Sequence, residues 1–298
     1  MTFDNSEEQL QLDEQDLSIF EEPEGYLPPQ PKPTFQTFSR KDEHLLQSDN
    51  FKTLHIRLVG SHPLWAHLLW NAGKCFAWYL DEHKELVKGK KVLELGAGGA
   101  LPSLIAAVNG AEKVVITDYP DDDLIDNIRH NVNTNLSTDI CTDNIRVLGY
   151  IWGKDTYPLL NAISKSEKTS NLYDLIILSD LIFNHSQHKA LLKTCKECLD
   201  PINGQILVFF THNLPDLAHK DMEFFEEAKN LQWKVEKIFK EIMSPMFKED
   251  HGCETRQSMI QNNLILNFSI FSPAGDLCNE IARDKPKIKL NLINFYKY

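Results

Sequence analysis

Short apolar runs and amphipathic stretches alternate along most of this chain. An apolar run of about four to eight residues bounded by turn residues is typical of a buried strand, whereas apolar residues recurring every three or four positions are typical of a helix. These patterns predict strands at 53–59, 92–96, 114–118, 145–152, 172–180, 205–211 and 233–243, with a less regular last strand at 264–272. They predict helices at 63–80, 100–109, 121–136, 156–165, 187–200 and 216–230.

The order of these elements predicts the fold class. Strands and helices follow one another strictly between residues 92 and 230, which is the pattern of a parallel, doubly wound α/β sheet with helices on both faces. We therefore expect a mostly parallel, Rossmann-like sheet whose ligands bind where the strands end.

Composition and charge divide the chain into three parts. With 298 residues and 42% hydrophobic content, the chain is long enough for one sizeable domain, which we place at residues 51–272. Residues 1–50 are predicted to be largely disordered, because residues 1–25 hold nine acids without Lys or Arg and a proline-containing linker follows. Residues 273–298 form a mildly basic tail to which the sequence assigns no role.

The same features argue against several classes of function. The formal net charge of −12 leaves no basic face of the kind that nucleic-acid binding needs, so no nucleic acid is expected as a partner. No apolar stretch reaches the roughly 18 residues that a membrane-spanning helix requires, and the N-terminus does not read as a signal peptide. Six scattered cysteines favour a reducing, cytoplasmic location, and the Cys195-x-x-Cys198 pair lacks the further ligands of a metal site.

A glycine-rich turn and an acid mark the first candidate site. The first strand of the expected sheet ends in Gly96, Ala97 and Gly98, and the next strand ends on Asp118, about 20 positions later. Glycines at a strand end let the backbone turn tightly and approach a ligand, and a carboxylate at this spacing accepts hydrogen bonds from ribose hydroxyls. The pattern predicts a nucleoside pocket.

Two details favour S-adenosylmethionine over a dinucleotide in that pocket. In the dinucleotide fingerprint a third glycine lets helix and strand pack closely beside a pyrophosphate. In this chain Leu101 takes the place of that glycine. Glu94 lies two residues before the turn, where a carboxylate would repel a pyrophosphate but attract a cationic amino-acid group. A nicotinamide-dependent oxidoreductase is the alternative enzyme class at this point.

Two later strand ends add candidate residues. Trp152 follows the third strand and precedes a glycine, where a flat ring can stack on an adenine. The fourth strand ends in Ser179 and Asp180, and an acid directly after an apolar strand needs either a partner or a chemical role. Because parallel strands end at the same edge of a sheet, we expect these residues beside the glycine turn.

Together these segments resemble the seven-β-strand protein methyltransferases that have a D-x-x-F/Y motif. Asp180-Leu-Ile-Phe183 matches the motif, and Pro63-Leu-Trp65 is typical of the fungal branch that methylates translation elongation factor 1-alpha. The resemblance extends from about Phe20 to about Arg256, and the basic tail departs from it. The matching segments are 58–73, 92–102, 117–121, 149–152 and 174–185.

The resemblance implies a seven-stranded methyltransferase sheet and a role for each matched position. Asp180 and Phe183 would be catalytic and receive the substrate amine, and His185 just after them is a further candidate proton acceptor. The implied substrate is the N-terminal glycine and adjacent lysine of elongation factor 1-alpha. Methylation of another protein lysine and a non-catalytic scaffold are the alternatives. S-adenosylmethionine would be the cofactor, bound by Trp65, Trp70, Gly96, Ala97, Gly98, Asp118, Trp152 and Ser179.

Overall fold

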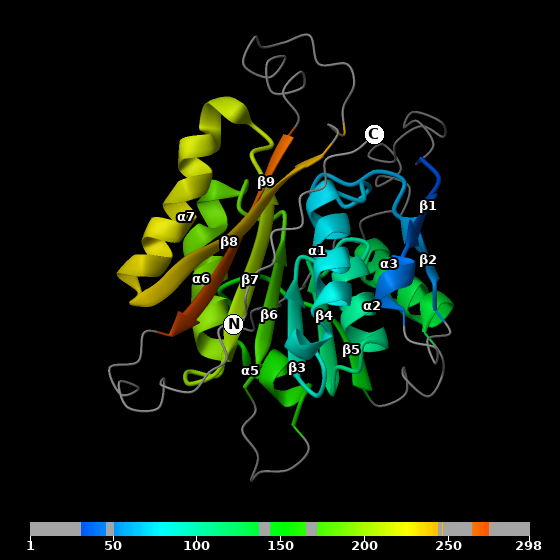
Figure 1. Ribbon diagram of the computed structural model, residues 1–298, viewed down its shortest axis with the longest axis horizontal. Coiled ribbons are helices and arrows are strands. Elements are labelled where there is room, and N and C mark those ends of the chain that lie inside the picture. The colour runs from blue at the N-terminus through cyan, green and yellow to red at the C-terminus, as the bar shows by residue number, and fades with distance from the viewer. Residues whose placement is uncertain are drawn as a thin grey trace, which may run out of the picture.

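The computed structural model describes residues 31–45, 51–136, 144–164, 172–243, 246 and 264–273. The acidic segment 1–30 and the tail after Pro273 lie outside the described residues, so the predicted disorder of the former stays a prediction. The strands (Figure 1) are β1 Thr34–Ser39, β2 Thr53–Leu58, β3 Lys91–Leu95, β4 Lys113–Asp118, β5 Ile145–Gly149, β6 Leu175–Ser179, β7 Gln205–Thr211, β8 Trp233–Met243 and β9 Leu264–Pro273. The α-helices are α1 Asn71–Glu82, α2 Leu101–Val108, α3 Asp122–Asn135, α5 Tyr157–Asn161, α6 His188–Cys198 and α7 Ala218–Asn230.

A seven-stranded sheet forms the centre of the molecule, in the order β5-β4-β3-β6-β7-β9-β8. The strands from β5 to β7 in this order pair in parallel, whereas β9 is antiparallel to both β7 and β8. The order reverses at β3, which has β4 on one side and β6 on the other. Doubly wound sheets bind their ligands at such a switch point. The predicted fold class, a mostly parallel α/β sheet, is confirmed.

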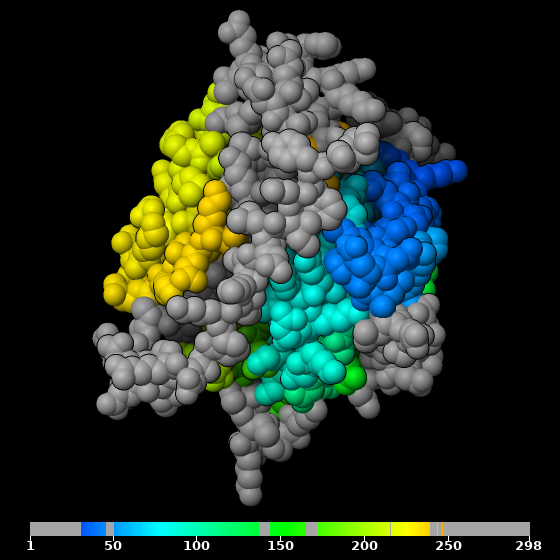
Figure 2. All heavy atoms as spheres, in the orientation of Figure 1, coloured from blue at the N-terminus to red at the C-terminus, as the bar shows by residue number. Residues whose placement is uncertain are grey.

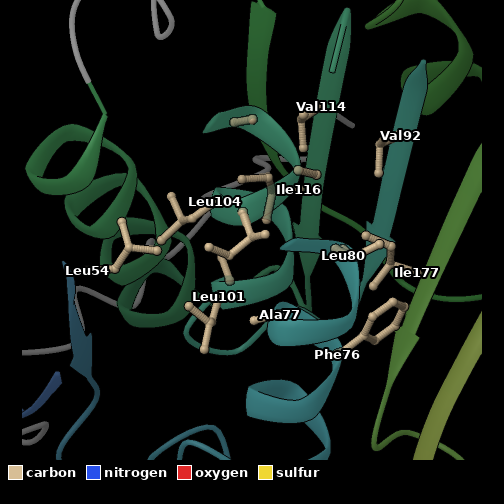
Figure 3. Packing of buried hydrophobic residues seen from close by; sticks show 14 of the residues in the cluster. Leu54, Phe76, Ala77, Leu80, Val92, Leu101, Leu104, Val114, Ile116 and Ile177 are labelled. Carbon is tan, nitrogen blue, oxygen red and sulfur yellow. The ribbon is translucent and has the colours of Figure 1, made fainter. Parts of the chain in front are cut away.

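Helices cover both faces of this sheet. Successive residues of a strand point to opposite faces, so Val92 packs in the core with α1, α2 and α3, and Leu93 packs in the core with α5, α6 and α7. On the first face Phe76 of α1 stacks on Phe209 of β7, with ring centroids 3.8 Å apart. Figure 3 shows part of this core, where side chains of α1, α2 and the sheet converge. Within the described residues, none of the helices has the length and hydrophobicity needed to cross a lipid bilayer.

The apolar pattern does not predict the first strand. Residues 34–39 fall in the segment expected to be largely disordered, but the structure pairs β1 antiparallel with β2. Phe38 of β1 is buried against Trp78 of α1, with ring centroids 5.4 Å apart. Figure 2 shows this hairpin, in blue, on the surface beside the cyan residues of α1. The strand depends on partners that it meets only in the fold, and its six residues alternate too briefly to predict it.

A second correction concerns residues 63–80, which are predicted to form one helix. Helix α1 begins only at Asn71, and residues 63–70 are turns and irregular backbone. Trp65 has a positive φ of 62°, which a continuous right-handed helix does not allow. Apolar residues of this stretch line a cavity instead of packing as one helix face, so their helical spacing is misleading.

The last strands do not follow chain order. The strands predicted at 233–243 and 264–272 are both present, as β8 and β9. The later strand, β9, lies between β7 and β8, so β8 forms the edge of the sheet. Periodicity indicates which residues of a strand face the core, but it does not indicate the strand's neighbours.

Candidate active site

A cavity of about 960 Å³ lies at the carboxyl ends of β3, β4, β5 and β6. Its size is near the upper end of the range for small-molecule sites, so it has room for a cofactor together with a substrate side chain. Segments far apart in the sequence meet here, and which of their residues touch a ligand stays a prediction. The residues predicted to bind the cofactor or to receive the substrate amine line this cavity: Trp65, Trp70, Gly96, Ala97, Gly98, Asp118, Trp152, Ser179, Asp180 and Phe183.

The glycine turn between β3 and α2 shapes one wall of the cavity. Gly96 and Gly98 have φ angles of 63° and 53°, a conformation that residues with a Cβ rarely adopt. A Cβ on Gly96 would also lie 2.7 Å from Leu181 Cδ2 and 3.1 Å from Trp152 Cζ2. The ring of Trp152 therefore lies against the glycine turn, in the loop position predicted for it.

Asp118 ends β4, and the backbone already orients its carboxylate. The N–H of Gly98 donates to Oδ2 and the N–H of Tyr119 donates to Oδ1, each at 2.7 Å. Burial raises the pKa of Asp118, and the two backbone donors oppose that shift. Each carboxylate oxygen accepts more than one hydrogen bond, so Asp118 retains acceptor capacity for a pair of hydroxyls in the cavity.

Glu94 does not take the position expected of it. Its side chain is fully buried and does not line the cavity, and Oε2 accepts the backbone N–H of Ser103 at 3.1 Å. Within the described structure, Oε1 has no hydrogen-bond partner. Burial raises the pKa of Glu94 to about 8, because an ionised carboxylate would lose its hydration there.

We expect Glu94→Gln to change how stability depends on pH. A carboxyl group whose pKa is raised by folding stabilises the protein while it is protonated, and this contribution is lost as pH rises from about 4.5 to about 8. Glutamine does not ionise, so the variant should gain stability relative to the wild type across this range, by on the order of a few kcal/mol in total.

Urea denaturation at pH 5, 7 and 9 measures the difference in the free energy of unfolding. Glu223→Gln, at an exposed position of α7, is the control, and its difference from the wild type should stay small at each pH. A Glu94→Gln difference that does not grow with pH would contradict the expectation.

The turn before α1 forms a rim of the cavity. Trp70 directly precedes α1, and its indole Nε1–H donates to the carbonyl oxygen of Trp65 at 3.3 Å. The two indole rings meet edge to face, with centroids 6.4 Å apart, and Trp65 is 49% exposed. Ser179 at the end of β6 lies close to Gly73 in the first turn of α1. The rim therefore presents an open aromatic surface next to the end of β6.

Asp180 follows β6 and is held by the end of β7. It is 4% exposed, with a φ of 57° that Asp and Asn adopt more readily than most residues. Its Oδ1 accepts the backbone N–H of Thr211 at 3.0 Å, and the Thr211 hydroxyl and the Asn213 amide donate to it at 3.1 and 3.3 Å. Burial raises the pKa of Asp180 to about 6, although these donors oppose the shift. The carboxyl is therefore mostly ionised at neutral pH and can attract a cationic amine.

Asp221 in α7 is not among the residues predicted from the sequence. It is 2% exposed, and its oxygens lie 2.7 Å from His185 Nε2 and from His212 Nδ1. It thereby joins the loop after β6, which carries Phe183, to the end of β7. In the described structure neither histidine lines the cavity, and His185 contacts Asp221, so its role as a proton acceptor stays a prediction. Asp221 lies in an ordinary amphipathic helix, where no local signal marks it.

The cavity is acidic. Its aspartates are Asp118, Asp121, Asp123 and Asp180, and among the described residues that line it there is no Lys or Arg. A pyrophosphate would be repelled here, whereas the sulfonium and ammonium groups of S-adenosylmethionine would be attracted, as would a cationic substrate amine. The residues present therefore fit a methyl donor better than a nicotinamide dinucleotide.

Proteins similar to this chain identify its family. The sequence model of the lysine methyltransferase family matches residues 50–231. The protein N-terminal and lysine N-methyltransferase EFM7 of Debaryomyces hansenii is 47% identical over 236 residues, which is 79% of this chain and 90% of that protein. The Schizosaccharomyces pombe protein of the same name is 43% identical over 237 residues, which is 79% of this chain and 89% of that protein. This chain belongs to the lysine methyltransferase family.

As a lysine methyltransferase, the protein takes its methyl group from S-adenosylmethionine. The predicted cofactor and enzyme class are therefore confirmed, and the oxidoreductase and scaffold alternatives are wrong. The role of each residue around the cavity stays a prediction.

Proposed function

We propose that this lysine methyltransferase modifies the N-terminal glycine and the adjacent lysine of translation elongation factor 1-alpha, in the cytoplasm. The similar fungal proteins are named protein N-terminal and lysine N-methyltransferases, which covers both kinds of amine. The elongation factor is suggested by the resemblance of Pro63-Leu-Trp65 and Asp180-Leu-Ile-Phe183 to the fungal branch that methylates it. The acidic cavity carries the proposal, because an α-amine next to a lysine brings two positive charges to the site.

In this proposal residues at the strand ends would hold the cofactor. Asp118 would bind the ribose hydroxyls, and the turn from Gly96 to Gly98 would contact the methionine part. Trp152 would lie against the adenine, with Ser179 next to it. Trp65 and Trp70 close the cavity from the side of α1, at the rim where the indole rings meet.

The reaction requires an amine that has lost its proton. An α-amine, with a pKa of about 7.7–8.0, is partly deprotonated at neutral pH, whereas a lysine amine with a pKa of about 10.4 is almost fully protonated. Asp180 attracts the ammonium form and orients its nitrogen, and the proton leaves to this carboxylate or to water. Phe183 packs on the nitrogen as methyl groups accumulate, because an aromatic face attracts a cation.

Alignment is the enzyme's other contribution. S-adenosylmethionine, when bound, would supply a methyl group on a positively charged sulfur, and the sulfur would keep the electron pair of the broken carbon–sulfur bond. Asp180 and the rim hold the nitrogen lone pair in line with that bond, so the displacement proceeds from a fixed geometry. The new carbon–nitrogen bond uses the lone pair that loss of the proton exposed.

Transfer from labelled S-adenosylmethionine to recombinant, unmethylated elongation factor 1-alpha tests the proposal. Mass spectrometry of the N-terminal peptide locates the label. Two substrate controls are used: one has arginine in place of the lysine beside the N-terminal glycine, and one has an acetylated α-amine. We expect label on both amines of the unmodified substrate and only on the remaining amine of each control.

The outcomes separate the parts of the proposal. Label confined to an internal lysine would overturn the N-terminal site. No label, from an enzyme that binds S-adenosylhomocysteine in calorimetry, would overturn elongation factor 1-alpha as the substrate and leave the family assignment intact.

A further inference from the structure

Three asparagines lie along one face of α3, four residues apart. Asn127, Asn131 and Asn135 are 2%, 0% and 5% exposed, although each carries a polar amide. Buried polar side chains of this kind normally have hydrogen-bond partners. Here the main partners are backbone groups of β2, the second strand of the N-terminal hairpin.

Asn135 and Asn131 bind β2 as a neighbouring strand would. Asn135 Oδ1 accepts the N–H of His55 at 2.7 Å, and its Nδ2 donates to the His55 carbonyl oxygen at 2.8 Å. Asn131 makes the same pair of bonds with Arg57, each at 2.8 Å. Because β1 pairs with the other edge of β2, these amides supply the hydrogen bonds of an edge that has no strand beside it among the described residues.

Asn131 also makes a bond that Asn135 does not. Its Nδ2 donates to the carbonyl oxygen of Gly99 at 3.1 Å, whereas Nδ2 of Asn135 makes its other bond within α3, to the Asn131 carbonyl oxygen at 2.8 Å. Gly99 belongs to the glycine turn, and Gly98 directly before it donates to Asp118. The turn is thus held by Asp118 at one residue and by Asn131 at the next.

The hairpin supports the same turn by packing. A Cβ on Gly99 would lie 2.8 Å from Ile56 Cγ2 and 3.1 Å from Leu58 Cδ2, so side chains of β2 reach the turn directly. Asn131 is therefore the point at which α3, the hairpin and the glycine turn are joined by hydrogen bonds.

We propose that Asn131 is a positioning residue for the methyl-donor site. By binding Arg57 and Gly99 at once, it fixes the glycine turn in the conformation that receives S-adenosylmethionine. Asn131 does not line the cavity, so it acts through Gly99 and not by contact with the cofactor. This role does not depend on which protein is the substrate.

The variants Asn131→Ala and Asn135→Ala form a matched pair. Each removes a buried amide together with its bonds to β2, and only the first removes the bond to Gly99. We expect Asn131→Ala to raise the dissociation constant for S-adenosylhomocysteine about five- to tenfold, as for the loss of one hydrogen bond that orders a binding turn. Asn135→Ala should change it by less than about twofold, because its bonds do not reach the turn.

Isothermal titration calorimetry measures both affinities without any turnover. Steady-state kinetics should show the same split, with KM for S-adenosylmethionine raised in Asn131→Ala and unchanged in Asn135→Ala. Both variants lose stability, so the measurements are made at a temperature at which circular dichroism shows each protein folded.

If Asn131→Ala does not fold, Asn131→Asp and Asn135→Asp replace the pair. An aspartate at 131 still accepts the N–H of Arg57 but cannot donate to Gly99 when ionised. A purely structural role would affect the two positions alike. Equal affinities within a pair, whether both normal or both weakened, would therefore overturn the proposal.

Discussion

Replacing Asp180 with asparagine is expected to lower kcat by roughly 100- to 1,000-fold while the affinity for S-adenosylhomocysteine changes by less than about twofold. Asparagine has the same shape, tolerates the φ of 57° and can still accept the N–H of Thr211. It lacks the negative charge that attracts the substrate ammonium and can accept its proton. Kinetics with the protein substrate measure kcat, and calorimetry measures the affinity.

The pH profile separates this chemical role from a structural one. Because the pKa of Asp180 is raised to about 6, its carboxylate forms as pH rises through that value. The wild-type pH–rate profile should therefore show an inflection near pH 6, and Asp180→Asn should lack this inflection and keep only the dependence that deprotonation of the substrate amine imposes. Unfolding would give the opposite trend. Because folding raises the pKa of Asp180 from 3.8 to about 6, ionisation of Asp180 lowers the free energy of unfolding as pH rises across that range. Asparagine does not ionise, so the variant avoids this loss of stability.

Asp174→Asn is the matched control for this variant. Asp174 immediately precedes β6, at the opposite end of the strand, and its carboxylate accepts the N–H of Lys91 at 2.7 Å, far from the cavity ends of the strands. This control should keep the wild-type kcat. A wild-type kcat in Asp180→Asn would show that Asp180 does not serve the substrate amine.

The parallel strands could be predicted because the burial of both their faces determines the pattern of apolar residues along them. β3, β4 and β6 are covered by helices on both faces, so each reads as a mostly apolar run that ends at a turn, and in β3 the buried Glu94 interrupts this run. β1 could not be predicted, since it is stabilised by pairing with β2 and by packing on α1. Residues 63–70 have helical spacing, but the sequence does not show that their apolar side chains line a cavity.

The same distinction applies to the site. Gly98, Asp118 and Asp180 could be predicted because each lies at or just after the end of a strand, and topology brings parallel strand ends together. Asn131 and Asp221 lie on amphipathic helices, and their partners come from other elements. Their polar side chains resemble ordinary exposed helix residues. One sequence signal could have marked Asn131 as buried: it lies at helical spacing on the same face of α3 as the apolar residues Ile128 and Val132.

Arg40→Met is expected to lower the free energy of unfolding by about 3–5 kcal/mol, because it leaves a buried carboxylate without its cation. Arg40 follows β1, and its guanidinium binds Asp81 of α1 through Nε and Nη2, with bonds of 2.7 to 3.1 Å. The two side chains are 1% and 0% exposed. Nη2 also donates to Asn109 at the end of α2, at 3.1 Å. One residue thus fastens the hairpin to two helices of the domain.

Lys52→Met is the control, because Lys52 belongs to the same hairpin region but forms an exposed ion pair with Asp42. Their atoms lie 2.7 Å apart with side chains 61% and 78% exposed, and such pairs contribute less than about 1 kcal/mol. Urea denaturation should show that Arg40→Met with Asp81→Leu is more stable than Arg40→Met alone, since the second change removes the unpaired charge. Equal stability of the Arg40 and Lys52 variants would contradict the expectation.

Because β2 packs against the glycine turn, loosening the hairpin through Arg40→Met should also weaken the binding of S-adenosylhomocysteine. Lys52→Met should leave this binding unchanged.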